Sequence, residues 1–351
     1  MVPYPKRLGI ALAAAALYAS YGIGAEPAAW KSRHAPEDAA WRSVEQHLVY
    51  NSGADPETLD PHQVTTMDAF RLVEALFEGL VTQDPETLEP RPGCAERWEV
   101  SEDGRIYRFF LREGLRWSDG RELVSGDFLA SFRRALTAAT AASYAELYFH
   151  IQGAEAFYEG KEADFGAVGI EAVENRELVF RLAHPCGYFL DLLAMPVFFP
   201  VRLDVVEAHA ERWTQPGRMI GNGAFVLHAW RPRDRVILRK NARYWDRDFV
   251  KLERITALCV DDMNTAYGMY LEGGVHWLPA LPHSRMDEVR RHPDFYVSPF
   301  LGTYFYRFNV TRPPFDSAAV RQAFCRATDR RTITSELLNN GQQPVTSFCP
   351  P

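Results

Sequence analysis

The stretch WEVSEDGRIYRFFLREGLRWSDGRELVSGDF, residues 98–128, carries the clearest structural signal in the chain. Apolar and polar residues alternate over Trp98–Val100, and a second apolar segment follows over Ile106–Leu111. The residues between them, 101–104, are of the types that form tight turns, and Gly104 can take a positive φ at no steric cost. This pattern predicts a β-hairpin.

The second half of the stretch predicts another turn and the start of a helix. Trp117–Gly120, with the sequence WSDG, has the residue types of a tight turn. Ser125 is placed to cap a helix that runs from Asp127 towards Leu136. These residues include no nucleophile–base pair, metal-ligand cluster or phosphate-binding loop, so we interpret the stretch as scaffold.

The first 25 residues have the pattern of a secretory signal peptide. Lys6 and Arg7 form a basic start, residues 8–21 form an apolar core, and Ile23–Ala25 resembles a signal-peptidase site. The apolar run is too short for a membrane span, and no cysteine directly follows it to carry a lipid anchor. We expect cleavage and export; the alternative is an uncleaved signal anchor.

The rest of the composition is that of a folded protein with an acidic surface. Hydrophobic residues make up 47% of the 351 residues, which is enough for packed cores in two domains. The formal net charge of −7 argues against nucleic-acid binding.

The sequence lacks the motifs of common catalytic and metal sites. The five cysteines are odd in number, widely spaced and without a CxxC motif, so we interpret most of them as buried thiols. The ten histidines form no HExxH motif, GxSxG is absent, and the GNGAF sequence at 221–225 lacks the third glycine of a dinucleotide-binding loop. We therefore predict no catalytic residue, no metal site and no cofactor.

Hairpins and helices follow one another irregularly along the chain, which predicts an α/β fold with mixed sheets. Strands are predicted at 47–51, 224–230, 236–239, 255–260 and 304–309, with a further hairpin at 170–183. Helices are predicted at 67–80, 127–136, 144–158, 203–213, 263–271, 319–326 and 333–338.

A series of short motifs resembles, in collinear order, the oligopeptide-binding proteins of bacterial ABC importers (extracellular solute-binding protein family 5). The motifs are Leu59–His62 (LDPH), Leu76–Leu80 (LFEGL), Pro92–Trp98, Leu111–Gly120 (LREGLRWSDG), Asp127–Phe128, Gly221–Phe225 (GNGAF), Asn241 with Tyr244–Trp245, Phe308–Asn309, Pro314–Phe315, Val320–Ala323 and Asp329–Arg330. Each motif alone is weak, and their common order is what makes the resemblance specific.

The resemblance implies a periplasmic binding protein-like fold of class II, the peptide-binding type, with mixed sheets. After the signal peptide (1–25) and a leader (26–45), lobe I would comprise residues 46–78 and 203–301. Lobe II would be an insertion at 79–202, and residues 302–351 would begin an incomplete third lobe.

The resemblance also implies a function without chemistry of its own. The protein would capture an oligopeptide in an interlobe cleft by backbone hydrogen bonds and deliver it to the permease subunits of an ABC importer. The implied ligand-binding residues are Thr65, Thr66 and Met67, through their backbone, and Tyr144. A structural role is the alternative: Thr66 or Asp68 would cap the following helix, and Tyr144 would only pack in lobe II. We expect a monomer that is at most peripheral to the membrane.

Some expected family features are missing. The chain ends at Pro351, before the part of the third lobe that would hold the peptide amino terminus. Leu338 stands where the oligopeptide branch has a lysine, and Gly302 where it has a cysteine. A degenerate, truncated or split-gene relative that acts as a partner-binding module is therefore the alternative function. In either case we expect Phe324, Leu337 and Leu338 to expose apolar surface.

Overall fold

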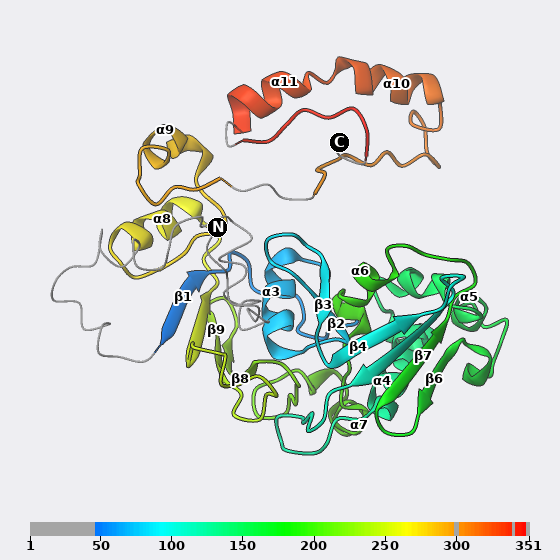
Figure 1. The fold of residues 1–351 in the computed structure, drawn as a ribbon. Helices are drawn as coiled ribbons and strands as arrows, with labels where there is room; N and C mark the ends of the chain where they lie inside the picture. Colours follow the sequence, from blue (N-terminus) through cyan, green and yellow to red (C-terminus); the bar gives the residue numbers. More distant parts are fainter. Residues whose placement is uncertain (1–45, 298–301, 339–340, 349–351) are drawn as a thin grey trace. The chain divides into compact units, whose positions relative to one another are not determined.

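The computed structural model describes residues 46–297, 302–338 and 341–348 (Figure 1). The chain divides into two compact units, with the boundary between Pro279 and Ala280. Among the described residues, no helix combines the length and the apolar character that crossing a bilayer requires. The predicted signal peptide and leader lie outside the described residues.

One mixed sheet of the first unit has the strand order β1-β10-β9-β8. Strand β1 (His47–Asn51) runs parallel to β10 (Arg254–Leu258), while β9 (Arg235–Lys240) and β8 (Phe225–Arg231) continue the sheet antiparallel. Helix α3 (Met67–Leu76) packs its apolar face against this sheet (Figure 1). The buried residues of this core all lie in two ranges, 48–77 and 199–257.

A second, fully antiparallel sheet has the order β4-β5-β7-β6. The predicted hairpin is confirmed as β4 (Ala95–Val100) and β5 (Ile106–Leu111), and the second predicted hairpin as β6 (Ile170–Val173) and β7 (Glu177–Arg181). Helix α4 (Ser125–Leu136) covers one face of the sheet (Figure 1).

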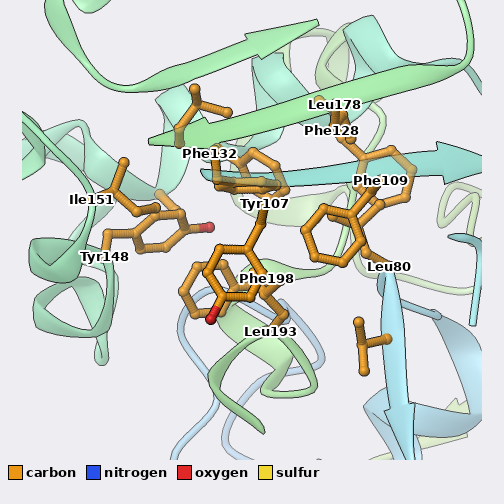
Figure 2. Close-up of a cluster of buried hydrophobic side chains, with 14 of the residues drawn as sticks. Leu80, Tyr107, Phe109, Phe128, Phe132, Tyr148, Ile151, Leu178, Leu193 and Phe198 are labelled. Carbon is orange, nitrogen blue, oxygen red and sulfur yellow. The ribbon is translucent and has the colours of Figure 1, made fainter. Parts of the chain in front are cut away.

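The core beneath this second sheet contains a cluster of aromatic rings packed among aliphatic side chains (Figure 2). Phe109 contacts Phe180 edge to face at 5.6 Å between ring centroids, and Tyr148 lies 4.1 Å from Phe198. The Tyr148 hydroxyl donates to the Val197 carbonyl at 2.9 Å, so its polar end is satisfied although the residue is buried. The buried residues of this core lie between Leu80 and Phe198.

Shorter elements complete the first unit. They are β2 (Val81–Gln83), β3 (Pro90–Pro92), η2 (Ala138–Thr140), η3 (Ala145–His150), α5 (Ala154–Tyr158), η4 (Phe165–Ala167), α6 (Phe189–Leu193), η5 (Pro196–Phe198), α7 (Leu203–His209), η6 (Ala210–Arg212) and α8 (Met263–Leu271).

Several helix predictions in the first unit were wrong in their bounds, and the helix predicted at 203–213 is divided into α7 and η6. Helix α3 stops at Leu76 rather than at residue 80, because Phe77 is extended, with φ −134°. The helix predicted at 144–158 is divided into η3 and α5. Gly153 separates them with φ +75°, and a Cβ there would lie 2.6 Å from the Ala167 carbonyl oxygen.

The predicted Ser125 cap was also wrong. Val124 is the N-cap of α4, and its amide donates to the Asp127 carboxylate at 3.1 Å. The Ser125 hydroxyl instead donates to the Glu174 carbonyl at 2.6 Å. The helix therefore starts two residues earlier than predicted, and its first turn is capped from within by Asp127.

The second unit contains η7 (His283–Arg285), α9 (Met286–Val289), α10 (Ala318–Ala327), α11 (Arg330–Thr332) and η8 (Ile333–Leu338). The strand predicted at 304–309 was wrong, because that segment forms no ladder in the described part of the unit. Phe324 (51% exposed) and Leu337 (69%) expose apolar surface as expected, while Leu338 is half-buried.

Candidate functional site

Several of the sequence motifs meet where the chain passes between the two cores of the first unit. Glu78 lies between Phe77 of one core and Leu80 of the other. Its buried carboxylate accepts hydrogen bonds from the Tyr244 hydroxyl at 2.8 Å and from the Trp245 indole nitrogen at 2.7 Å. The carboxyl group thus joins the LFEGL motif to the YW motif.

Glycines allow the other motifs to approach this junction closely. A Cβ on Gly221 would lie 2.1 Å from the Leu76 carbonyl oxygen, and one on Gly223 would lie 2.6 Å from backbone atoms of residues 76 and 77. The amide of Ser118, in the WSDG turn, donates to the Gly221 carbonyl at 2.9 Å. The WSDG and GNG motifs therefore contact each other, which supports the interpretation of the WSDG turn as scaffold.

The electrostatics of the junction follow from burial. Burial raises the pKa of Glu78 to about 6, although hydrogen bonds from Trp245, Tyr244 and Cys94 and the charge of Arg112 lower it. Burial also raises the pKa of the Cys94 thiol well above its usual value. This cysteine is an inert packing and hydrogen-bonding group rather than a nucleophile.

The LDPH motif forms a second link between the two cores. The Asp60 carboxylate accepts two hydrogen bonds from Arg134 of α4, at 3.1 and 2.5 Å. Burial lowers the pKa of His62 to about 4, so its ring is neutral and can accept from Arg134 through Nδ1 at 2.8 Å. Its Nε2 bonds to the Phe199 carbonyl at 3.1 Å. These contacts hold the start of the loop that leads to α3.

The Thr65–Met67 segment follows directly, at the N-terminus of α3. The predicted capping role of Thr66 is confirmed, since its hydroxyl accepts from the Ala69 amide at 3.4 Å. The Glu57 carboxylate accepts from the amides of Thr65 and Thr66, at 2.8 and 3.0 Å. It also accepts from their hydroxyls, at 3.1 and 2.6 Å.

Two backbone groups of this segment stay open. Within the described residues, the Thr65 carbonyl and the Met67 amide take part in no hydrogen bond. The Met67 side chain is 47% exposed. The segment therefore presents one acceptor and one donor, two residues apart, to a binding partner.

Tyr144 lies close to the same segment. The Ser143 amide donates to the His62 carbonyl at 3.1 Å, and the Ser143 hydroxyl donates to the Gln63 carbonyl at 2.9 Å. The Tyr144 ring lies 6.2 Å from the ring of Phe70 on α3. Tyr144 thus lies beside the residues that flank Thr65–Met67, although it is about 80 positions away in the chain.

No pattern in the sequence indicated Glu57 as a partner of this segment. An exposed glutamate in a polar loop is common, and its reach to Thr65 and Thr66 depends on the path of the intervening loop. The expectation of buried thiols holds for Cys94 and Cys186, whereas Cys259 is half-buried and Cys325 exposed. Cys349 lies outside the described residues.

Comparison with known proteins identifies the family. Residues 89–351 match the family model of bacterial extracellular solute-binding proteins, family 5 Middle. The chain belongs to this family. This agrees with the resemblance inferred from the motifs, and the named relatives below are binding proteins rather than enzymes.

Two curated relatives come from Escherichia coli. The "Probable deoxycholate-binding periplasmic protein YgiS" is 37% identical over 316 residues, which are 88% of this chain and 57% of the relative. The periplasmic oligopeptide-binding protein OppA is 32% identical over 311 residues, 87% of this chain and 57% of the relative. The chain thus spans less than two thirds of the length of these relatives.

Solved structures confirm the fold class. The murein tripeptide binding protein MppA of Escherichia coli superposes with a TM-score of 0.83 at 33% identity, over 87% of this chain and 60% of MppA. Haemophilus influenzae OppA in complex with the peptide RPPGFSPFR gives a TM-score of 0.83 at 30% identity, over 87% and 60% of the two chains. The fold is therefore that of the periplasmic peptide-binding proteins, with mixed sheets.

Proposed function

We propose that this chain is the solute-binding component of an ABC peptide importer, which captures oligopeptides outside the cytoplasm. The observation that carries the proposal is that Tyr144, through Phe70, and Ser143, through His62 and Gln63, lie against the elements on either side of Thr65–Met67. Family membership and the peptide-binding names of several relatives support it.

In this proposal the ligand pairs with the open backbone groups of the segment. The Thr65 carbonyl would accept from a ligand amide, and the Met67 amide would donate to a ligand carbonyl, as in the addition of a strand to a sheet edge. Backbone pairing of this kind tolerates many side-chain sequences, because it makes no use of them. Tyr144 would contact the ligand from the other core.

The division into lobes is also a proposal. Residues 46–78 and 203–301 would form lobe I, 79–202 lobe II, and 302–351 the beginning of lobe III. The separation of the two buried cores at residues 77–80 and 198–199 supports the first boundaries. Residues 1–25 would direct export to the periplasm, where the monomeric, liganded protein would dock on the permease subunits. No chemistry is assigned to the protein itself.

A second candidate ligand follows from one relative. The 37% identity to a protein named as deoxycholate-binding points to an amphipathic carboxylate as the alternative to a peptide. Such a ligand would lack the repeating amide groups that can pair with Thr65 and Met67.

Isothermal titration calorimetry on the purified chain tests both candidates. Tri-, tetra- and penta-alanine are expected to bind with similar affinity, whereas deoxycholate below its micellar concentration should give no heat of binding. Binding of deoxycholate alone would favour the second candidate. If a folded sample binds none of these, and mixed tri- to pentapeptides also fail, the protein does not carry peptides and a partner-binding role would replace this function.

A further inference from the structure

The N-terminus of α3 already holds an anion that the chain itself supplies. Amides at the start of a helix have no partner within the helix and carry partial positive charge, so they attract carboxylates. Here the Glu57 carboxylate takes the amides of Thr65 and Thr66 and both hydroxyls, at 2.6–3.1 Å. Every N–H group of the segment except that of Met67 is therefore occupied.

We propose that Glu57 is a positioning residue that makes this segment select the amide backbone of a ligand and reject a ligand carboxylate. With Glu57 in place, a ligand meets one acceptor, the Thr65 carbonyl, and one donor, the Met67 amide, which suits a peptide unit. Without Glu57, the amides and hydroxyls of Thr65 and Thr66 would be left open beside the helix N-terminus, which suits a carboxylate. This proposal refines the proposed function and, where it concerns peptide ligands, rests on it.

The local charges agree with this role. Although partial burial acts to raise the pKa of Glu57, the hydrogen bonds from Thr66 and Thr65 outweigh it and keep the pKa below its usual value. Glu57 is therefore ionised at neutral pH. Asp68, in the first turn of α3, adds a second carboxylate that is paired with Arg71. A ligand carboxylate would meet repulsion as well as occupied donors.

Calorimetry with tetra-alanine, as the free acid and as the C-terminal amide, tests whether Glu57 controls this selection between peptide ligands. The wild-type protein should bind the two forms within two-fold of each other. Glu57→Ala should bind the free acid about five-fold more tightly than the amide. For Glu57→Gln, the ratio of the two affinities should lie between the ratios of the wild type and of Glu57→Ala. Glu102→Ala, at the exposed turn between β4 and β5, is the matched control and should keep the wild-type ratio. Equal ratios in wild type and Glu57→Ala would overturn the proposal.

A second measurement does not depend on peptide binding. In nitrogen-15 correlation spectra titrated with sodium acetate, the amides of Thr65, Thr66 and Met67 should shift in Glu57→Ala and stay unchanged in the wild type. Glu57→Gln serves if the alanine variant does not fold. If no peptide binds but acetate shifts these amides in Glu57→Ala and not in the wild type, the proposed function fails and the role of Glu57 stands. If acetate shifts these amides equally in all variants, the role of Glu57 is refuted.

Discussion

The carboxyl group of Glu78 combines full burial with a complete set of donors. Tyr244 and Trp245 come from the side of one core, and Cys94, whose thiol lies 3.3 Å from the carboxylate, comes from the other. Removing a carboxylate from water is unfavourable, and these hydrogen bonds offset only part of that cost. Glu78 therefore joins the two cores at a fixed point. Its negative charge lowers the free energy of unfolding.

Stability should consequently rise as the pH falls through the titration of Glu78. Its pKa is about 6 in the folded protein against an ordinary value of 4.5, so the folded state binds the proton more tightly. As the pH falls from well above 6 to well below 4.5, the free energy of unfolding should gain about 2 kcal/mol in total from this group, most of it between pH 7.5 and 4.5. Urea denaturation of the wild type and of Glu78→Gln at pH 4.5 to 7.5 measures the gain as the difference between the two pH profiles.

The control for this experiment is Glu102→Gln, which removes an exposed carboxylate far from the junction in sequence. Its pH profile should run parallel to that of the wild type. Parallel profiles for Glu78→Gln and the wild type would instead show that Glu78 does not titrate in this range.

At the scale of elements, the approach of the GNG turn to the end of α3 depends on its glycines. In Gly223→Ala the new Cβ would lie 2.6 Å from backbone atoms that cannot move without displacing α3 or β8. We expect a loss of about 3 kcal/mol or more in the free energy of unfolding. Gly126→Ala, in the first turn of α4 with open space around its Cβ position, should instead gain up to about 1 kcal/mol.

Thermal unfolding followed by circular dichroism distinguishes these two alanine variants. The midpoint of Gly223→Ala should fall and that of Gly126→Ala should stay or rise. A similar small change in both would mean that the GNG turn can relax away from α3, and that close approach is not why these glycines are there.

Elements with local signals could be predicted from the sequence, and those that depend on distant partners could not. The hairpin at Ser101–Gly104 follows from its own turn residues, and Gly104 indeed has φ +66°. The break at Gly153 depends on the close approach of Ala167, which no local pattern encodes. The segment 304–309 has the alternation of a strand, but a strand also needs a partner to pair with.

In the candidate site, too, local features could be predicted from the sequence and long-range contacts could not. Thr66 as a cap was predictable, because capping acts over three residues. Tyr144 and Thr65–Met67 were named together only through the family resemblance, and the contacts of Ser143 with His62 and Gln63 were not predicted. The contact of Glu57 with Thr65 and Thr66 was missed, because it requires the path of a loop that no periodic pattern describes.

At the scale of the whole molecule, the two compact units differ in how much apolar surface they bury. Helix α3 buries six residues, whereas α10 buries none, although Phe324 packs against Phe308 and Phe315. Amides of α10 should therefore exchange with deuterium at least ten-fold faster than those of α3, because local opening exposes little new apolar surface. Hydrogen-exchange mass spectrometry gives this comparison, and equal protection of the two helices in a sample shown to be monomeric would contradict it.

The path of the chain between the two cores of the first unit has an evolutionary consequence. The chain leaves one core after Phe77 and returns at Phe199, and a Cβ on Gly79 would lie only 2.8 Å from the Phe199 ring. The segment between these points therefore has neighbouring ends, as inserted domains commonly do. Recombination can exchange such a cassette without rerouting the remaining chain, so the surfaces that carry Tyr144 and Met67 can diversify independently of each other.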